Sequence, residues 1–168
     1  VVNHMKSSLI LILHDIRSAH NVGSMFRTAD GAGVTEIILS GYTPCPPKGD
    51  ALYLSDADKA LRKTALGAEA TMPWRQVASL PRLLTKLNRD GYEIVALEQL
   101  PGSVSYRDYQ PKKSVALIVG NEVGGVAPTI LKRCDAVIEI PMRGSKNSLN
   151  VSVATGIALY QIIATMKR

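Results

Sequence analysis

Short continuous runs of apolar residues alternate along this chain with segments that have helical periodicity. The runs are Leu9–Leu13, Glu36–Leu39, Glu93–Leu97, Val115–Val119 and Val137–Ile140. Continuous runs, unlike runs that alternate with polar residues, are typical of strands covered on both faces. The pattern therefore predicts an α/β fold with a mainly parallel central sheet and helices on both of its faces.

The helical segments have recognisable starts. The first helix is expected to begin with Asn21 as its capping residue, because an apolar stripe with helical spacing starts directly after it. Two more helices are expected over residues 55–66 and 80–89, the second with Pro81 in its first turn. The proline-rich segment Tyr42–Gly49 is typical of a surface loop, where a substrate could be contacted.

The last helix, expected from about Ser148 to Thr165, is apolar nearly all the way round. A helix covered on one side only would show a polar face. We therefore expect one side to meet the sheet and the other to meet the same helix of a second copy, in a two-fold homodimer. Trp74 is expected to be a core or interface anchor, since no other aromatic residue is near it in the sequence.

Length and composition fit one compact domain. With 168 residues and 46% hydrophobic content, the chain can bury a core, and we expect a single domain over residues 1–168. No apolar run is long enough to cross a bilayer, and the start does not resemble a signal peptide, so a cytoplasmic location is expected. The two cysteines and three histidines lack metal-ligand spacing, so we expect neither a disulfide nor a metal site.

Positive charge points to a class of partner. Lys and Arg number 20 against 14 Asp and Glu, which gives a net charge of +6 and an isoelectric point near 9.4. Such a chain suits a polyanionic partner such as nucleic acid, through phosphate contacts, although many basic proteins bind no nucleic acid. Aromatic residues make up only 5% of the chain, so an open base-stacking platform is not expected.

Three loops follow strands and should meet at one edge of a parallel sheet, where open α/β proteins bind ligands. They begin near Leu97, Gly120 and Ile140. The third loop, up to Ser152, leads from a strand to the apolar last helix and is rich in small, polar and cationic residues. Ser148 is expected to cap that helix, whose free amides would face a polar group.

The second loop, Gly120–Gly125, offers glycines for close backbone approach and one acid, Glu122. Glu122 could accept hydrogen bonds from a ligand or a neighbouring loop, or form a structural ion pair, and the residues alone leave these alternatives open. The turn lacks the end of a Walker loop, and no dinucleotide-binding glycine pattern follows the first strand. No serine, histidine and acid set indicates a hydrolase.

Arg27 falls off the apolar stripe of the first helix. It shares a face with Gly23, where the missing side chain would let a ligand or another backbone approach closely. The alternative is a solvated Arg27 paired with Asp30, a contact that contributes only a few tenths of a kcal/mol.

Three blocks in this order resemble the SpoU (TrmH-like) family of the SPOUT RNA 2'-O-ribose methyltransferases. The blocks are Asn21–Arg27, Gly120–Gly125 and Ile140–Ser152, and the similarity runs from about Leu9 to Ile163. The resemblance implies a C-terminal trefoil knot, which is rare among proteins, whose loops wrap S-adenosylmethionine. It also implies a homodimer with each site near the subunit interface, in agreement with the apolar last helix.

The implied reaction transfers the cofactor's methyl group to a ribose 2'-hydroxyl of tRNA or rRNA. By resemblance Arg27 is the catalytic arginine, and Asn21, Ser148 and Asn150 position it, the hydroxyl or the adjacent phosphate. The residues implied to touch the cofactor are Leu97, Gly120, Asn121, Glu122, Gly125, Ile140, Met142, Ser148 and Leu149. Because a guanidinium stays protonated, we interpret Arg27 as an anchor for the phosphate and the developing alkoxide.

Two other interpretations fit parts of the pattern. A non-catalytic RNA-binding module could keep the same fold, but the catalytic blocks are all present. A Rossmann-type oxidoreductase would need the missing dinucleotide pattern. Many family members carry an added RNA-binding domain, which we do not expect in this chain. Candidate phosphate contacts are Lys48, Lys112, Lys113, Arg143 and Lys146.

Overall fold

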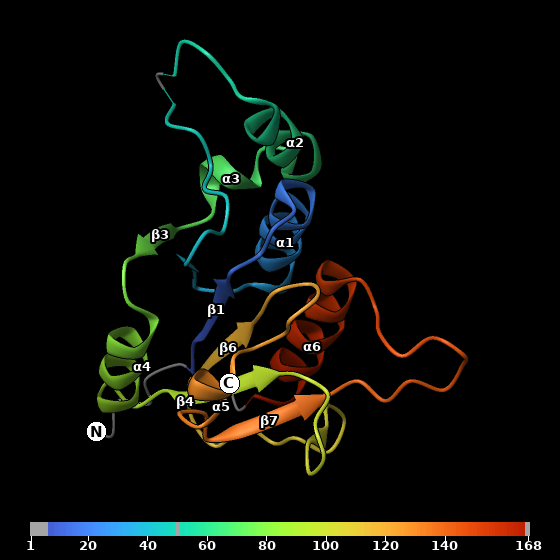
Figure 1. The fold of residues 1–168 in the computed structure, drawn as a ribbon. Coiled ribbons are helices and arrows are strands. Elements are labelled where there is room, and N and C mark those ends of the chain that lie inside the picture. Colours follow the sequence, from blue (N-terminus) through green and yellow to red (C-terminus); the bar gives the residue numbers. More distant parts are fainter. Residues whose placement is uncertain (1–6, 50, 167–168) are drawn as a thin grey trace.

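A parallel sheet of seven strands runs through the computed structural model, which describes residues 7–49 and 51–166 (Figure 1). The strands are β1 (Leu9–His14), β2 (Glu36–Ser40), β3 (Trp74–Val77), β4 (Glu93–Leu97), β5 (Val104–Ser105), β6 (Val115–Val119) and β7 (Ala136–Glu139). Their order across the sheet is β3-β2-β1-β6-β4-β7-β5, and all neighbours are parallel. The carboxyl ends of the strands therefore share one edge, where ligands of such sheets bind.

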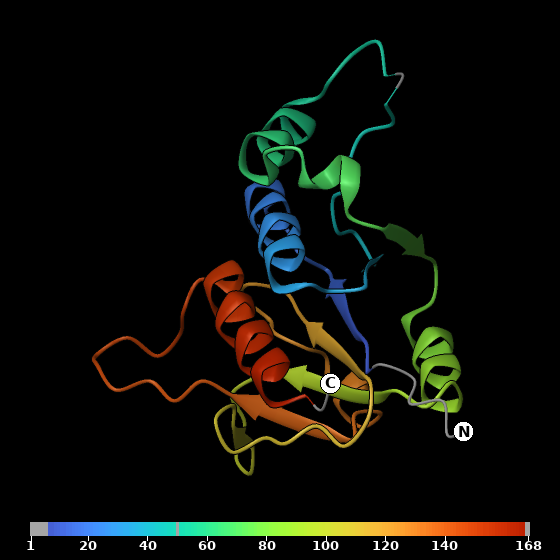
Figure 2. The ribbon, with the colours of Figure 1, turned by 180° about the vertical axis from the view of Figure 1, so that it is seen from behind.

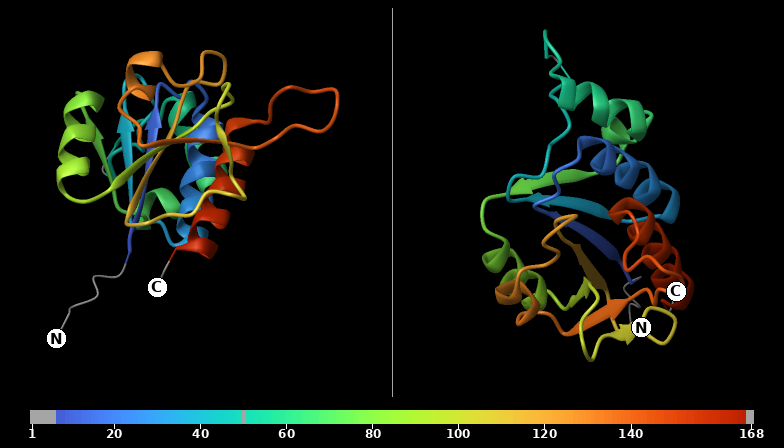
Figure 3. Two further views of the ribbon diagram at one scale, coloured as in Figure 1. Left: turned by 90° about the horizontal axis from the view of Figure 1, so that it is seen from below. Right: turned by 45° about the vertical axis from the view of Figure 1, so that its right-hand side comes forward.

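Helices cover both faces of the sheet, which Figure 3 (left) shows between α4 on one side and α1 and α6 on the other. The side of α1 (Ala19–Ala32) also carries α2 (Asp56–Ala65), α3 (Ala68–Thr71) and α6 (Val151–Thr165). The opposite face carries α4 (Leu80–Arg89) and α5 (Pro128–Leu131). The predicted α/β architecture is confirmed, and the trefoil knot stays a prediction. Within the described ranges, no helix has the length and hydrophobicity to cross a membrane.

The side chains of β1 show why its apolar run is continuous. Leu9, Leu11 and Leu13 pack into the core on the side of α1, while Ile10 and Ile12 pack into the core on the side of α4. None of them is more than 5% exposed. Burial of each such side chain contributes roughly 1.5–3 kcal/mol, so a strand between two layers gains from apolar residues at every position.

Two strands were not predicted from the sequence. β3 lies at the edge of the sheet and places the exposed Arg75 and Gln76 directly after Trp74, so no apolar run marks it. β5 has only two residues. Trp74 itself packs edge-to-face against Phe26, with 6.4 Å between ring centroids, as expected of a core anchor. β7 begins and ends one residue before the predicted run.

Two predicted helix caps are wrong. Ser18, not Asn21, caps α1, and its hydroxyl accepts a hydrogen bond from the Asn21 N–H at 3.3 Å. Asn150, not Ser148, caps α6, and its side chain accepts from the Ser152 N–H at 2.9 Å. In both cases two residues with good capping ability stand close together, and the sequence alone does not decide between them. Asn21 therefore lies inside the first turn of α1, and Ser148 lies in the loop before α6.

The helix α6 has one packed face and one open face. Ala158, Leu159 and Ile162 are buried in the core shared with the sheet and α1. Val153 and Tyr160 are 52% and 56% exposed. Packing of one side against the sheet is thus confirmed, and a second copy on the open face stays a prediction.

Gly23 lies directly against α2, and this contact sets the position of α1. A Cβ at residue 23 would overlap the Leu61 carbonyl oxygen and the Thr64 hydroxyl. Gly23→Ala should therefore lower the free energy of unfolding by about 1–3 kcal/mol, the usual cost of overpacking, despite the higher helix propensity of alanine. Equilibrium unfolding in urea measures this change.

Gly31→Ala in the same helix is the matched control. A Cβ at Gly31 meets only the hydroxyl of Tyr160, at 3.2 Å, at the end of a side chain that can move. This variant should be at least as stable as the unchanged protein. Equal destabilisation by both substitutions would contradict the close approach of α1 to α2.

Candidate active site

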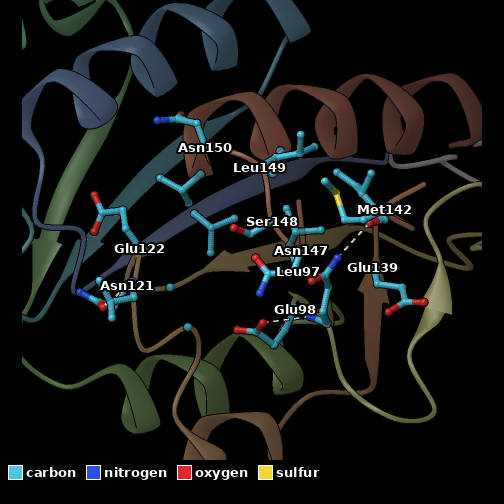
Figure 4. Close-up of a pocket in the computed structure, with 18 residues that line it drawn as sticks. Leu97, Glu98, Asn121, Glu122, Glu139, Met142, Asn147, Ser148, Leu149 and Asn150 are labelled. Atoms are coloured by element: carbon cyan, nitrogen blue, oxygen red, sulfur yellow. Dashed lines mark hydrogen bonds between the residues drawn. The ribbon is translucent and has the colours of Figure 1, made fainter. Parts of the chain in front are cut away.

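The loops that follow β4, β6 and β7 enclose a cavity of about 430 Å³ at the carboxyl edge of the sheet (Figure 4). Leu97 and Val119 contribute from the strand ends, and Val151 and Ala154 contribute from the start of α6. The loop between β7 and α6 also reaches outward from the body of the molecule (Figure 2). A cavity of this volume is large enough for a cofactor-sized ligand.

Every residue that the resemblance assigns to the cofactor lines this cavity. These residues are Leu97, Gly120, Asn121, Glu122, Gly125, Ile140, Met142, Ser148 and Leu149, and Asn150 joins them. Figure 4 shows Ser148 and Asn147 between Glu122 on one side and Met142 on the other. The lining also contains residues that were not assigned to the cofactor from the sequence: Glu98, Gln99, Val119, Val123, Glu139, Asn147, Val151 and Ala154.

The turn Gly120–Gly125 closes tightly because of its glycines. Asn121 and Gly125 exchange backbone hydrogen bonds of 3.2 and 2.9 Å. A Cβ on Gly120 would lie 2.5 Å from the Gly125 carbonyl oxygen, and Gly125 adopts a left-handed φ of 64°. The turn therefore presents backbone groups to the cavity.

The side chain of Asn121 is engaged within the protein. Its amide group donates to the Asp15 carbonyl at 3.1 Å and to the Tyr42 hydroxyl at 2.8 Å. Its oxygen accepts from the backbone N–H groups of Val123 and Gly124. Because both donors and both lone pairs are in use, Asn121 can meet a ligand only through its backbone.

Glu98 joins two of the cavity loops. One of its carboxylate oxygens accepts from the Val126 N–H at 2.9 Å, and a Cβ on Gly125 would overlap the same oxygen. The next residue, Gln99, donates from its side chain to the Ile140 carbonyl at 3.2 Å. The sequence signal for Glu98 was its place directly after β4, where polar residues of parallel sheets meet ligands.

Glu122 holds the start of α1 against the Gly-rich turn. Its carboxylate accepts from the backbone N–H groups of Arg17 and Ser18, at 2.9 and 3.1 Å, and from the Asn21 side chain at 3.1 Å. Partial burial acts to raise the pKa of Glu122, but these hydrogen bonds outweigh it and lower the pKa below its ordinary value. Of the alternatives left open by the sequence, hydrogen bonding to a neighbouring loop is the one formed.

Asn21 and Asn150 connect the first and third sequence blocks. The Asn150 side-chain amide donates to the Asn21 oxygen at 3.1 Å, while the Asn21 amide donates to Glu122. Asn150 also caps α6. The three blocks therefore form one hydrogen-bonded chain at one end of the cavity.

Arg27 does not line the cavity of its own chain. It is exposed, and its place six residues beyond Asn21 puts it about 9 Å further along α1 and about 120° round the axis. Gly23, one turn earlier, faces α2, so the close approach that it permits is to the backbone of that helix. Arg27 and Asp30 both lie in the described part of the chain, and they do not form the ion pair that was the alternative.

The cavity and its surroundings differ in charge. Three carboxylates line the cavity, those of Glu98, Glu122 and Glu139. Arg143 and Lys146 lie exposed in the loop between β7 and α6. The arrangement suits a ligand with positive charge inside and an anionic partner outside. In the described part of the chain, no cluster of His, Cys, Asp and Glu is placed to hold a metal ion.

Sequence comparison finds related proteins across nearly the whole chain. A profile of the SpoU rRNA Methylase family matches residues 8–160. The 23S rRNA (guanosine-2'-O-)-methyltransferase RlmB of Haemophilus ducreyi is 35% identical over 165 residues, which cover 97% of this chain and 62% of that protein. The chain spans about three fifths of the length of the curated relatives it matches.

Two solved structures with the same fold are about as similar to this chain in sequence as each other. The AdoMet-bound rRNA methyltransferase from Sinorhizobium meliloti has a TM-score of 0.80 and 29% identity, over 94% of this chain and 56% of that one. The A. aeolicus TrmH/SpoU tRNA modifying enzyme has a TM-score of 0.79 and 30% identity, over 95% of this chain and 76% of that one.

The lowered pKa of Glu122 predicts a pH-dependent contribution to stability. At pH 7 the carboxylate is charged in the folded and the unfolded chain, and its hydrogen bonds stabilise the folded one. This contribution begins to fall near pH 4.3, about where an unfolded glutamate binds its proton, and is lost as the pH passes below the folded pKa. Glu122→Gln should therefore be less stable than the unchanged protein at pH 7.

Urea-induced unfolding at several pH values measures this difference. The gap in the free energy of unfolding should narrow as the pH falls from about 5 to below 4. A gap that stays constant over this range would contradict a role for the ionised carboxylate.

Proposed function

This chain belongs to the SpoU rRNA Methylase family, and from that premise we propose that it transfers a methyl group from S-adenosylmethionine to a ribose 2'-hydroxyl of transfer or ribosomal RNA. The relatives support the assignment, because RlmB of H. ducreyi is a 23S rRNA (guanosine-2'-O-)-methyltransferase and the S. meliloti structure contains AdoMet. The observation in this chain that carries the proposal is that the second and third sequence blocks line one cavity, and Asn21 of the first block is hydrogen-bonded to both of them.

The cavity fits the cofactor in size and in charge. When bound, S-adenosylmethionine supplies a methyl group on a positively charged sulfonium sulfur. The carboxylates of Glu98, Glu122 and Glu139 would stabilise positive charge in the cavity. The backbone of the turn 120–125 would hydrogen-bond the polar groups of the cofactor, since Gly120 and Gly125 place no side chain in the way.

The polar residues at one end of the cavity would position the RNA. We assign this role to Asn21 and Asn150, because their mutual hydrogen bond fixes both side chains beside the cavity. Ser148 is exposed in the same loop and would contact the ribose or the adjacent phosphate. Correct placement of the reactants is a main source of rate enhancement in a displacement reaction.

Arg27 would act from a second copy of the chain. It is exposed and does not line its own cavity, while the neighbouring α6 has an open apolar face with Val153 and Tyr160. A two-fold dimer through α6 would bring α1 of one copy to the cavity of the other. There the guanidinium would bind the phosphate and stabilise the alkoxide that forms on the 2'-oxygen, whose proton would pass to solvent by way of that phosphate. The new O–CH3 bond would replace the S–CH3 bond of the cofactor, which would leave as S-adenosylhomocysteine.

RNA would approach from the carboxyl edge of the sheet. Lys48, Arg143 and Lys146 lie in loops that leave strands at that edge, whereas Lys112 and Lys113 precede β6 at the opposite edge. We therefore assign phosphate contacts to the first three and not to the last two. Action on transfer or ribosomal RNA would take place in the cytoplasm.

The reaction is tested with S-adenosylmethionine that carries an isotopically labelled methyl group and with RNA from cells that lack this gene. The label should appear on ribose after digestion to nucleosides. Arg27→Ala should lower turnover by about 10²–10³-fold at saturating RNA and cofactor, and leave the Kd for the cofactor unchanged. Arg89→Ala, an exposed arginine on α4, is the control and should retain full turnover.

Turnover near that of the unchanged protein in Arg27→Ala would contradict a catalytic role. Binding of RNA and cofactor without transfer would favour the non-catalytic alternative. Mixing Arg27→Ala with Gly120→Val, in which the turn is blocked, tests the action across the dimer. Mixed dimers should recover activity, since one intact cavity then meets one intact arginine, and no recovery would contradict this arrangement.

Two double substitutions, one at each edge of the sheet, test which edge contacts the phosphates of the RNA. The double substitution of Arg143 and Lys146 by alanine should weaken RNA binding and lower the slope of log affinity against log salt by about 1 for each lost phosphate contact. The double substitution of Lys112 and Lys113 by alanine is the matched control and should change the slope little. Equal effects of the two pairs would contradict the assigned edge.

A further inference from the structure

The ring of Tyr42 is exposed, although its hydroxyl is held in place. The side chain lies just beyond β2 in the loop to α2, and 59% of the residue is exposed. Its hydroxyl accepts a hydrogen bond of 2.8 Å from the Asn121 side chain. Asn121 in turn belongs to the cavity lining, so one hydrogen bond links the ring to the wall of the candidate cofactor site.

The backbone around Tyr42 is fixed by several contacts. Asp15, directly after β1, adopts a left-handed φ of 56°, and its carboxylate accepts from the Tyr42 N–H at 3.2 Å. Gly41 adopts a φ of 63°, where a Cβ would overlap that carboxylate. The buried Thr43 donates its hydroxyl to the carbonyls of Leu13 and Ser40. The ring is therefore presented to solvent by a rigid bend of the chain.

A fixed and exposed aromatic ring beside a binding site is suited to hold a flat ligand. The next residue, Thr43, is buried, so the ring is not part of a continuous exposed apolar segment that would favour a protein partner. The chain carries a net charge of +6, and Arg17 lies exposed in the loop between β1 and α1, with its backbone bonded to Glu122. Proteins bind single-stranded RNA through aromatic rings that stack on its bases and positive charges that contact its phosphates.

We propose that the ring of Tyr42 stacks on a nucleobase of the RNA, next to the ribose that is placed at the cavity. The inference rests on the function proposed above and adds the residue that recognises a base. The low aromatic content does not favour an extended surface for base stacking, but one preorganised ring is enough to stack on one base. Stacking does not distinguish strongly among bases, so Tyr42 would hold the nucleotide while other contacts select it.

Binding of two short single-stranded probes tests the proposal. One probe is an oligoadenylate, and the other is a ribose-phosphate oligomer of the same length without bases. The unchanged protein should bind the oligoadenylate more tightly. Tyr42→Leu should weaken binding of the oligoadenylate by about tenfold or more and leave binding of the base-free oligomer and of S-adenosylmethionine unchanged. Fluorescence anisotropy at fixed salt measures both affinities.

Two further variants separate stacking from structure. Tyr42→Phe removes the hydrogen bond to Asn121 and keeps the ring, so it should retain most of the preference for bases. Tyr53→Leu removes a ring that is 80% exposed near the start of α2, and it should leave both affinities unchanged. An equal loss in Tyr42→Phe and Tyr42→Leu would assign the effect to the hydroxyl and overturn the proposal.

The remaining outcomes separate this inference from the proposed function. If the unchanged protein transfers methyl groups to RNA while Tyr42→Leu binds oligoadenylate as tightly as before, only the inference fails. If the unchanged protein binds neither probe and transfers no methyl group, the proposed function fails and the inference fails with it. If Tyr42→Leu weakens both probes alike and changes the oligomeric state in size-exclusion chromatography, the ring belongs to an interface between copies and the proposal is overturned.

Discussion

The carboxylate of Glu122 is the group on which the geometry of this site depends. Backbone amides at the start of α1 hydrogen-bond to it, so the Gly-rich turn after β6 and the first helix are held together. Asn21 extends the connection to Asn150, which caps α6. Three segments that are far apart in the sequence thereby keep a fixed arrangement at the edge of the sheet, and the first and last helices take part in it.

Close backbone contacts make this arrangement possible. Gly23 lets α1 approach α2, and Gly120 and Gly125 let the turn fold onto itself beside Glu98. The distribution of charge follows from the same layout, with carboxylates inside the cavity and cations such as Arg143 in the loop outside it. A basic chain can thus offer an acidic cavity to a cationic ligand and a basic rim to an anionic partner, as the proposed reaction requires.

Much of this fold follows from the sequence, because strands between two helical layers need continuous apolar runs such as Leu9–Leu13. The edge strand β3 has no such run, since Arg75 and Gln76 face solvent. Part of the cavity lining, including Gly120 and Leu149, was predicted through the family resemblance. Eight other lining residues were not assigned to the cavity, Glu98 among them, because a single acid after a strand is a weak signal. The predictions of the helix caps are wrong where two residues of similar capping ability lie close together, as Ser148 and Asn150 do.

A crystal structure of the protein with S-adenosylhomocysteine, the product of the cofactor, is the strongest test of the proposed site. One such molecule should lie in each cavity, bound through the backbone of Leu97, Gly120, Ile140 and Leu149, with Arg27 of a second copy beside it. A ligand bound elsewhere would contradict the proposed site, and Arg27 far from every cavity in the assembled dimer would contradict its proposed role.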